Sequence, residues 1–526
     1  MRINKRSIFL LIAIVMLLQL IVLPINAEDT VYYSTVGAKG YKLMSSYEIV
    51  NTGYNSAFTV RAMVLVGAVS NSPYQQNINY KITPLPKYTY VDSAGNIFAE
   101  IVIDEIKSKE TKKIIVEKEF INSGVSYSGE IYTMNGDDTE FKEEINNGQY
   151  YESGEKVETT ATEIAKKALD FDDSKTEVNL AKDIYDFVNL YISYDKDPLY
   201  ANKGALNAIK TGKGVCDEYA TLFTALSRAV GIPARVATGY WLTEPLKAGA
   251  WNDVSEKGHA WAEFYLPQVG WIPVEPTYFL TVNGVRTPDN EHFANFNSDE
   301  IHLLNAYQSN DIKSDIGIRY SYYKITELDI KFGQQAIMPI ASTSVDYSFS
   351  DISSSWAKDY INELYNKGIL FAKQDDLYKP ADKITRAEFS AFLVNTLRLD
   401  SKDSEIVFKD VNEDSDYSVF IKTAAAYGLI KGNPQGYFKP NDTITREDAA
   451  VIMQRAIDVL TVDYAAISEP SFNDMDQVST YAKDAVKLIY SMKIMEGKPG
   501  DIFDPKNSTT RAEASKLLDN FINATE

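Results

Sequence analysis

The sequence predicts a multidomain α+β protein with a β-sandwich-like N-terminal domain, a central α+β core and a C-terminal, mainly helical threefold repeat. Its 526 residues are enough for about three to five domains of roughly 100–200 residues each. The spacing of apolar residues changes from a strand-like to a helical period near residue 158. A motif then recurs three times in the last third of the chain, which indicates a repeat architecture.

The composition excludes several classes of protein. Hydrophobic residues make up 45% and charged residues 24%, which is ordinary for globular domains and excludes wholesale disorder. The formal net charge of −20 argues against a nucleic-acid partner, because phosphate binding needs clustered positive charge. The single cysteine excludes an intramolecular disulfide and any multi-cysteine metal site.

Residues 1–27 have the layout of a secretory signal peptide. A basic start is followed by the apolar run Ile8–Val22 and by the small residue Ala27 at the expected cut. The alternative is a membrane anchor that is retained as a single span. No second run in the sequence approaches the ~20 apolar residues that a spanning helix needs, so we expect the protein to be exported.

Residues 28–150 are rich in β-strand signals. The runs 60–66 and 101–106 combine β-branched and other apolar residues, and the segment 93–96 between them has turn composition. We therefore expect an all-β, sandwich-like domain, to which the sequence assigns no chemistry.

Residues 155–285 are expected to form the α+β core, which holds the single cysteine. Cys216 follows the glycine-containing turn 212–214 and begins a stretch with an apolar helical face that stops near Gly231. The dipole at a helix N-terminus favours thiolate over thiol, which is a common way to activate a cysteine nucleophile. The alternative is a small buried hydrophobe, the commoner fate of a free cysteine.

A histidine and a carboxylate follow in a predicted β-hairpin. The alternating strand 258–266 carries His259 near its start, and the returning strand carries Glu275. A histidine beside a thiolate forms an ion pair with it, and a carboxylate behind the ring fixes its tautomer. A regular hairpin would leave residue 275 opposite residue 262, roughly 10 Å along the strand from His259. We therefore expect a bulge or an offset turn, with Glu263 as the weaker candidate for the carboxylate.

The segments around these residues resemble the transglutaminase-like superfamily, whose core is papain-like. The resemblance covers roughly 160–285 and rests on Gly-Val-Cys-Asp-Glu-Tyr-Ala, Ala-Val-Gly-Ile-Pro-Ala-Arg-Val and His-Ala-Trp-Ala-Glu-Phe-Tyr-Leu-Pro. It implies that Cys216 is the nucleophile, His259 the general base and acid, and Glu275 the third member of a catalytic triad. Glu275 departs from the family, which usually has aspartate at this position.

The segment 286–345 is expected to contain closing strands over 318–332 and, from residue 340 on, a linker. Two further histidines, His292 and His302, have no metal-ligand spacing, and we expect them to be structural or surface residues. The sequence contains no cofactor motif, so we expect neither a metal nor a cofactor.

The last third of the chain contains three units, for which we predict the boundaries 347–400, 406–464 and 470–526. Each opens with Phe-x-Asp, passes through a helical stretch and reaches a sequence of the Ile-Thr-Arg-Ala-Glu type. A threonine followed three residues later by Glu or Asp is a capping-box signature. The helix N-caps are therefore predicted at Thr385, Thr445 and Thr510.

An arginine follows each of these threonines and is expected in the first helical turn, where the helix dipole opposes a cation. The three are Arg386, Arg446 and Arg511. The recurrence of the arginine in all three units indicates a function. Free backbone N–H groups beside a guanidinium can bind a carboxylate or a phosphate. The alternative is pairing of the arginines with local aspartates or glutamates.

The three units resemble S-layer homology (SLH) modules, which bind secondary polymers of Gram-positive-type cell walls. The resemblance implies that Arg386, Arg446 and Arg511 contact an acidic, often pyruvylated, wall glycan. Repeat one departs from the pattern because Ala372 stands where the other two repeats have glycine. Trp356 is expected either to stack on a sugar or to pack in the core.

Together these features predict a secreted, cell-wall-attached cysteine enzyme that acts on protein or peptide amides. Attack of the Cys216 thiolate on an amide carbonyl gives a thioester, and transfer to an amine or to water then gives cross-linking, deamidation or proteolysis. The sequence does not separate these reactions. The alternative is a non-catalytic surface scaffold or adhesion protein with a degenerate core, for which the glutamate at position 275 is the main support.

Overall fold

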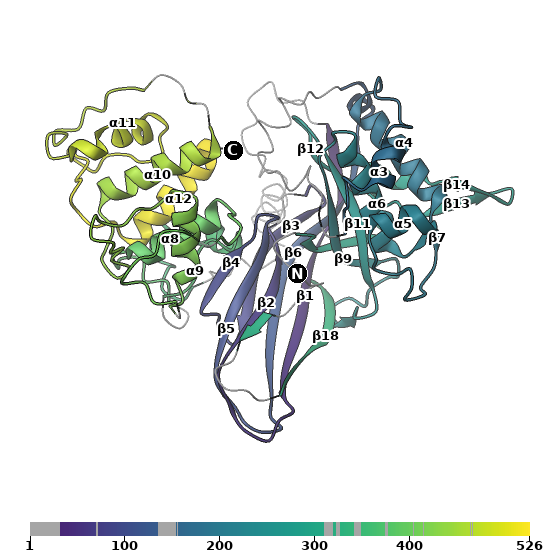
Figure 1. Ribbon diagram of the computed structural model, residues 1–526, viewed down its shortest axis with the longest axis horizontal. Helices are drawn as coiled ribbons and strands as arrows, with labels where there is room; N and C mark the ends of the chain where they lie inside the picture. The colour runs from purple at the N-terminus through teal and green to yellow at the C-terminus, as the bar shows by residue number, and fades with distance from the viewer. Residues whose placement is uncertain are drawn as a thin grey trace, which may run out of the picture.

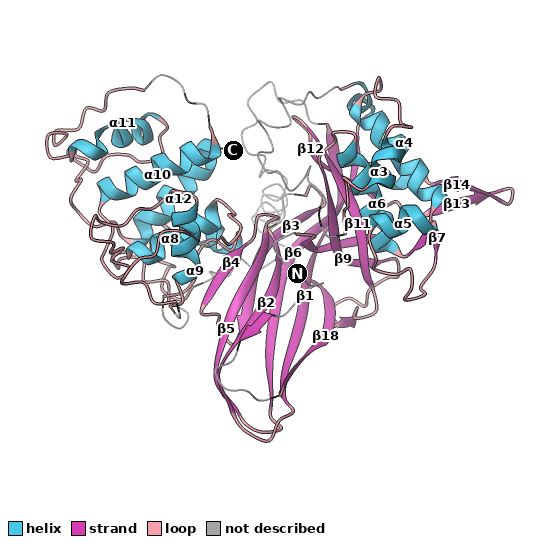
Figure 2. Cartoon of the chain, in the orientation of Figure 1, coloured by secondary structure: helices cyan, strands magenta, loops and turns pink. Residues whose placement is uncertain are grey.

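The computed structural model of the protein describes residues 32–69, 72–134, 154, 156–309, 319–321, 327–340, 349–373, 377–402, 404–413, 415–462, 464 and 467–525. The predicted signal peptide lies outside these residues. Figure 1 shows the long strands of the N-terminal region between two groups of helices, one from the middle of the chain and one from its C-terminal third. Figure 2 shows the same division by secondary structure and confirms the predicted mixed α and β class.

The N-terminal region forms a β-sandwich of two sheets. One sheet has the strand order β10-β18-β1-β6-β15, with β3 also paired to β6, and the other has the order β17-β2-β5-β4. Side chains from both sheets meet in one apolar core, in which Ile49 and Val116 of the first sheet lie with Val60 and Val64 of the second. The strands from this part of the chain are β1 (Tyr33–Asn51), β2 (Ala57–Ala68), β3 (Gln75–Thr83), β4 (Tyr88–Val91), β5 (Asn96–Ile106) and β6 (Thr111–Tyr127), followed by the 3₁₀ helix η1 (Gly129–Thr133).

Strands from much later in the chain complete the sandwich. β17 (Arg319–Ser321) pairs with β2, and β18 (Leu328–Ile340) runs antiparallel to β1. Two short strands, β10 (Asn252–Asp253) and β15 (Asn295–Phe296), extend the first sheet at its two edges. The middle of the chain is therefore inserted between strands of one domain.

The inserted α/β core, residues 156–309, is built on a four-stranded antiparallel sheet in the order β12-β11-β9-β16. Its strands are β9 (Ala234–Leu242), β11 (Gly258–Leu266), β12 (Gly270–Val274) and β16 (Ile301–Tyr307). Ala260, Ala262 and Phe264 on one face pack against the apolar side of α6. Alternate residues such as Trp261 point to the opposite face and pack against Tyr74 of the β-sandwich.

Helices and short strands complete the α/β core. The helices are α3 (Thr162–Ala168), α4 (Glu177–Tyr191), α5 (Ala205–Thr211) and α6 (Cys216–Ala229), with the 3₁₀ helix η3 (Asn290–His292). The short strands are the parallel pair β7 (Ser193–Tyr194) and β8 (Lys213–Gly214) and the projecting hairpin β13 (Phe279–Val282) and β14 (Val285–Pro288). Figure 1 shows this hairpin extending away from the rest of the core.

The C-terminal third forms three helical repeats that close into a ring. The main-chain N–H of Ile384 donates to Thr509 O at 3.0 Å, that of Thr509 to Ile444 O at 2.9 Å, and that of Ile444 to Ile384 O at 3.2 Å. Each repeat therefore bonds to both others near the pseudo-threefold axis. The helices are α7 (Lys358–Asn366), α8 (Arg386–Thr396), α9 (Ser418–Ala426), α10 (Arg446–Leu460), α11 (Lys483–Ser491) and α12 (Arg511–Thr525), with the 3₁₀ helix η4 (Thr480–Ala482).

The first repeat is docked on the β-sandwich through a continuous apolar core and several buried hydrogen bonds. Tyr80 donates its hydroxyl to Tyr365 O at 3.0 Å, and Asn395 Nδ2 donates to Thr89 O at 3.0 Å. Thr89 in turn donates its hydroxyl to Gly368 O at 2.9 Å. Within the part of the chain that the structure describes, no helix combines the length and apolar character needed to cross a membrane.

Candidate functional site

Cys216 is the first residue of α6, as predicted, and its side chain is half-buried. The chain before it is held by Glu218, whose Oε2 accepts the Val215 N–H at 2.9 Å and whose Oε1 accepts the Gly204 N–H at 3.2 Å. Gly214 permits this arrangement, because a Cβ there would lie 2.3 Å from Cβ and Cγ of Glu218. The thiol thus lies at a fixed helix N-terminus, where the dipole favours the thiolate.

His259 lies on β11 between the Cys216 thiol and the Glu275 carboxylate. Its Nε2 is 2.5 Å from Glu275 Oε2, and its ring is within hydrogen-bonding reach of Cys216. Since Nε2 faces Glu275, Nδ1 is the nitrogen left for the thiol. Burial lowers the pKa of His259, but the Glu275 charge and the hydrogen bonds to Cys216 and Glu275 outweigh it and raise the pKa to about 10. The ring is therefore an imidazolium at neutral pH, suited to pair with a thiolate.

Glu275 reaches His259 without the bulge that we expected. The pairing of β11 with β12 is regular from Leu266 opposite Gly270 to Ala262 opposite Val274, so Glu275 falls next to Trp261, two positions from His259. Residues two positions apart on paired strands are diagonal neighbours on one face of the sheet, within reach of long side chains. The side chains close the gap, and the longer glutamate is suited to this diagonal contact.

The Glu275 carboxylate is fully buried and firmly placed. Its Oε1 accepts the Thr277 N–H at 2.9 Å, and the Glu275 N–H donates to His292 O at 2.9 Å. Burial raises the pKa of Glu275, but the charge of His259 and its hydrogen bond lower the pKa by a larger amount. The net pKa therefore lies well below the ordinary range of a glutamate. Glu275 is therefore an anion at neutral pH.

Helix α4 holds the chain on either side of this carboxylate. Tyr185 donates its hydroxyl to Asp289 O at 2.7 Å and to Glu275 O at 3.2 Å. Asn189 Nδ2 donates to Pro276 O at 2.9 Å. Both side chains are buried, so the segment after β12 is fixed against the helix.

Glu263, the weaker candidate for the third member of the triad, is bonded to other side chains and not to His259. Its Oε2 accepts from Arg235 Nε at 2.7 Å, and its Oε1 accepts from the hydroxyls of Tyr74 at 2.5 Å and Ser72 at 2.9 Å. Tyr74 and Ser72 belong to the β-sandwich region, so Glu263 joins the two domains. Its carboxylate is committed to these donors and does not orient His259.

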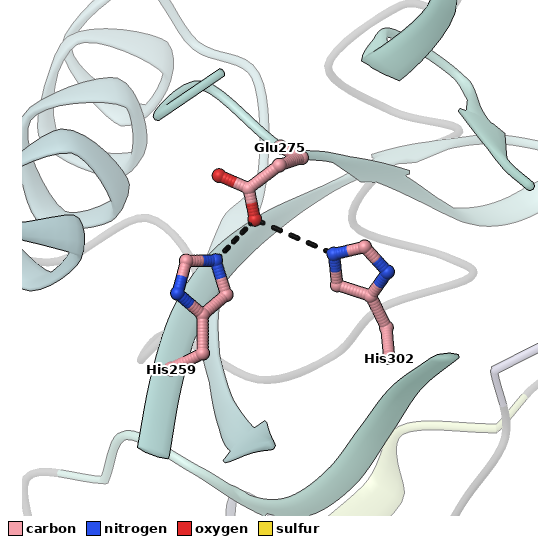
Figure 3. Close-up of side chains that lie close together, drawn as sticks. All are labelled: His259, Glu275 and His302. Atoms are coloured by element: carbon pink, nitrogen blue, oxygen red, sulfur yellow. Dashed lines mark hydrogen bonds and ion pairs between the residues drawn. The ribbon is translucent and has the colours of Figure 1, made fainter. Parts of the chain in front are cut away.

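The remaining histidines divide into one structural residue and one that lies in the site. His292 contacts Asp289 through Nδ1 at 2.9 Å and Glu300 through Nε2 at 3.1 Å, which agrees with the structural role predicted for it. His302 does not lie at the surface: its side chain is 1% exposed, and its Nε2 is 3.5 Å from Glu275 Oε2 (Figure 3). The sequence shows no signal for this proximity, because it arises from the order of strands in the sheet.

Ligand atoms of His259, Glu275 and His302 lie within 4.8 Å of one another, and these residue types bind divalent transition metals. Two ligands of a tetrahedral zinc ion, each about 2.0–2.1 Å from the metal, are separated by roughly 3.3 Å. The 2.5 Å contact between His259 and Glu275 is shorter than this and has the geometry of a charge-assisted hydrogen bond. The described arrangement therefore fits an ion pair better than a metal site.

In the C-terminal repeats, Thr385, Thr445 and Thr510 cap their helices as predicted, and each following arginine begins a helix. The main-chain N–H of each arginine is bonded to the next repeat around the ring: Arg386 to Asp442 O, Arg446 to Asn507 O and Arg511 to Asp382 O. These donors are not free for an anion, which corrects that part of our expectation.

The arginine side chains also reach across the boundaries between repeats. Arg511 has no exposed surface: its Nε donates to Tyr378 O at 2.7 Å, its Nη1 to Glu388 at 2.9 Å and its Nη2 to Phe371 O at 2.9 Å. The alternative of pairing with a carboxylate therefore holds for Arg511, although the carboxylate comes from another repeat. As placed here, Arg511 cannot contact an external polymer.

Arg386 and Arg446 are less fully engaged. Arg446 is buried and donates from Nε to Phe503 O at 2.8 Å and from Nη2 to Glu496 O at 3.1 Å. Arg386 is half-buried and donates from Nε to Phe438 O at 2.9 Å, while its terminal nitrogens have no hydrogen-bond partner among the described residues. Trp356 is 61% exposed, which excludes the core role considered for it.

Comparison with known proteins identifies both parts of the chain. The family model described as Transglutaminase-like superfamily matches residues 163–276, and that of the S-layer homology domain matches residues 348–390, 407–450 and 471–515. Exoglucanase XynX of Acetivibrio thermocellus is 36% identical over 172 residues, 32% of this chain and 16% of that protein. An S-layer protein of Bacillus thuringiensis subsp. finitimus is 27% identical over 186 residues, 35% of this chain and 22% of that protein.

These curated relatives are much longer than the matched region, since this chain spans 16%, 20% and 10% of the length of the first three. Among solved structures, a putative cysteine protease from Cytophaga hutchinsonii aligns over 59% of this chain and 100% of its own, with 15% identity and a TM-score of 0.38. The periplasmic domain of TgpA from Pseudomonas aeruginosa aligns over 44% and 88%, with 15% identity and a TM-score of 0.22. Likenesses this low carry no argument about function.

The residues matched by the two family models lie within the α/β core and the ring of helical repeats. SLH domains bind secondary cell-wall polymers, and S-layer proteins are among the relatives. The chain is a cell-surface, cell-wall-attached protein that carries a transglutaminase-like domain followed by three SLH domains.

Proposed function

We propose that this protein is a secreted cysteine enzyme that acts on protein or peptide amides while its SLH domains hold it at the cell wall. One observation carries the proposal. The His259 ring lies between the thiol of Cys216, at a helix N-terminus, and the buried carboxylate of Glu275, 2.5 Å from its Nε2. This arrangement favours a thiolate–imidazolium pair, which is the resting form of an activated cysteine nucleophile.

The chemistry follows from these positions. The Cys216 sulfur attacks the amide carbonyl carbon, a C–S bond forms, and the oxygen takes the negative charge near the start of α6, where the helix dipole favours an anion. The C–N bond then breaks as His259 gives its proton to the leaving amine, and a thioester remains. An incoming amine or water next gives a proton to His259 and attacks the thioester, and the C–S bond breaks to restore the thiolate.

The pH dependence of thiol labelling tests the activated cysteine. The chain has one cysteine, so iodoacetamide labelling of the full-length protein reports Cys216 alone. We expect rapid labelling to persist at acid pH, where an ordinary thiol reacts slowly, and this acid-pH labelling to be lost in His259→Gln. Cys216→Ala is the blank. Wild-type labelling with the pH profile of an ordinary thiol contradicts the proposal and favours the non-catalytic scaffold.

The reaction itself is tested with a glutamine-rich protein and a labelled primary amine, followed by mass spectrometry. Amine incorporation by wild type but not by Cys216→Ala assigns transfer. Conversion of glutamine to glutamate assigns deamidation, and new chain termini assign proteolysis. Absence of all three products over a broad substrate panel counts against an enzyme.

For the wall contact, we propose that Arg386 and Arg446 bind the acidic, often pyruvylated, polymer at the boundaries between consecutive repeats, and that Trp356 stacks on a sugar. Two observations support this. Arg386 is only half-buried, and its two terminal nitrogens make no hydrogen bond to any described residue. The ring of Trp356 is exposed. Full-length protein carrying Arg386→Ala and Arg446→Ala is expected to bind purified wall sacculi at least about tenfold more weakly, the loss of two charge-assisted contacts. The double variant Lys422→Ala and Lys487→Ala, on α9 and α11, is the charge-matched control.

A further inference from the structure

His302 occupies an unusual place for a histidine that sequence spacing gives no role. It lies on β16 opposite Trp241 of β9, and its side chain is almost completely buried. Its Nε2 is 3.5 Å from Glu275 Oε2, and neither of its ring nitrogens has a hydrogen-bond partner within normal hydrogen-bond geometry among the described residues. A buried polar ring with so few partners needs an explanation, because desolvation without compensation is costly.

Aromatic side chains surround the His302 ring and fix its orientation. The ring stacks on Phe296 with centroids 3.9 Å apart and planes at 13°, and on Trp241 at 5.5 Å and 21°. Trp261 meets it edge-on at 5.4 Å. Burial among these rings lowers the pKa of His302, and the Glu275 carboxylate opposes this shift without reversing it. His302 is therefore neutral at neutral pH, and its single N–H is the only proton that it can donate.

We propose that His302 is a positioning residue that donates its Nε2–H to the Glu275 carboxylate and so holds this carboxylate in line with His259. Glutamate has one more rotatable bond than aspartate, so its carboxylate needs more support to stay in one place. Figure 3 shows the His259 and His302 rings converging on the same oxygen of Glu275. The Thr277 N–H holds the other oxygen, and together the three donors leave the carboxylate little freedom. The inference rests on the proposed function, because the alignment of Glu275 with His259 affects the reaction only if His259 stabilises the Cys216 thiolate.

Thiol labelling provides the first test. His302→Phe keeps an aromatic ring to stack on Phe296 but removes the donor, whereas His302→Gln keeps an N–H donor. We expect labelling at acid pH to slow about tenfold in His302→Phe, with partial recovery in His302→Gln. His292→Phe, which removes the other buried histidine, is the matched control and should keep the wild-type profile.

The outcomes separate this inference from the proposed function. An unactivated thiol in wild type overturns both. An activated thiol in wild type, with the same labelling profile in folded His302→Phe, overturns the role of His302 alone. A wild-type labelling profile that changes when EDTA is added also overturns this role, because a metal would then be holding His259, Glu275 and His302 in place.

Ring tautomers provide a second test that needs no His302 variant. The chain has three histidines, so ring ¹⁵N signals of the full-length protein can be assigned individually. We expect His302 to be in the neutral Nε2–H form at pH 7 to 8, with a shift of its Nε2 signal in Glu275→Gln. A neutral Nδ1–H form in wild type overturns the proposal, since that tautomer has no proton to give Glu275.

Discussion

At the scale of single residues, the contribution of the buried His259–Glu275 pair to the free energy of unfolding depends on pH. The sign of this dependence follows from the shifts in the two pKa values. The pKa of His259 rises from 6.5 to about 10, so its contribution to stability is complete below pH 6.5 and is lost as the pH rises through 10. The pKa of Glu275 is lowered from 4.5, so its contribution is complete above pH 4.5 and is lost at lower pH.

Glu275→Gln should therefore lower the free energy of unfolding most between pH 4.5 and 6.5. A loss of about 3–5 kcal/mol is expected there, because the substitution leaves a buried imidazolium without its charged partner. The difference between wild type and variant should shrink toward pH 10, as His259 loses its proton. Urea unfolding at several pH values measures this difference in stability. A difference that stays constant from pH 5 to 10 contradicts the pairing of a charged His259 with a charged Glu275.

Sequence motifs named three of the four side chains that converge here. Cys216, His259 and Glu275 each lie within a short, distinctive segment, whereas His302 is brought to Glu275 only because β16 follows β9 in the sheet. A spacing rule for metal ligands cannot find such a residue, because its relation to the others is set by strand order. The motif identifies Glu275, but the pairing of the two strands gives only main-chain positions, and the contact with His259 depends on the length and direction of the glutamate side chain.

At the scale of elements, the approach of β16 to β9 depends on Gly239. This residue lies opposite both His259 and Leu304, and a Cβ added to it would be 1.7 Å from the Leu303 carbonyl oxygen. That oxygen belongs to the main chain, so β16 itself must move to admit a methyl group.

Gly239→Ala is therefore expected to destabilise the protein by about 2–4 kcal/mol, in the range of overpacked or strained core sites. Because the displaced strand carries His302, the variant should also slow thiol labelling at acid pH. Thermal unfolding and labelling measure the two effects, with Gly258→Ala as control, since a Cβ at Gly258 meets nothing within 4 Å. Unchanged stability in Gly239→Ala would show that the two strands are not held this closely.

At the scale of the whole molecule, the sequence predicted the sandwich, the α/β core and the threefold repeat, but not how the chain connects them. The strand patterns do not show that β18 pairs with β1, since the paired residues, from Asn51 with Leu328 to Gly40 with Ile340, lie 277 to 300 positions apart in the sequence. Nor do they show that the buried carboxylate of Glu263, which is paired with Arg235 in the core, accepts a hydrogen bond from Tyr74 of the sandwich region. Such long-range pairings are set by packing.

This buried network should couple the two domains energetically. Glu263→Ala leaves Arg235 buried without its partner, for an expected loss of about 3–5 kcal/mol, and Tyr74→Phe removes a donor to the carboxylate. Because the two residues share one contact, their effects should be non-additive by at least about 1 kcal/mol. A double-mutant cycle from urea unfolding measures this coupling, and strict additivity would mean that the domains are joined elsewhere.

The ring of repeats leads to a final prediction, that two arginines at equivalent positions have different roles. Arg511→Ala removes three bonds to the first repeat and leaves the buried Glu388 carboxylate without its charged partner, so it should lower stability by about 3–5 kcal/mol. Arg386→Ala removes one bond from a half-buried side chain and should cost about 1 kcal/mol. We expect the reverse order for sacculus binding at a temperature where both full-length variants are folded, because Arg386, unlike Arg511, has terminal nitrogens without a hydrogen-bond partner among the described residues. Equal losses of binding in the two folded variants would mean that Arg511 leaves its buried position to meet the polymer.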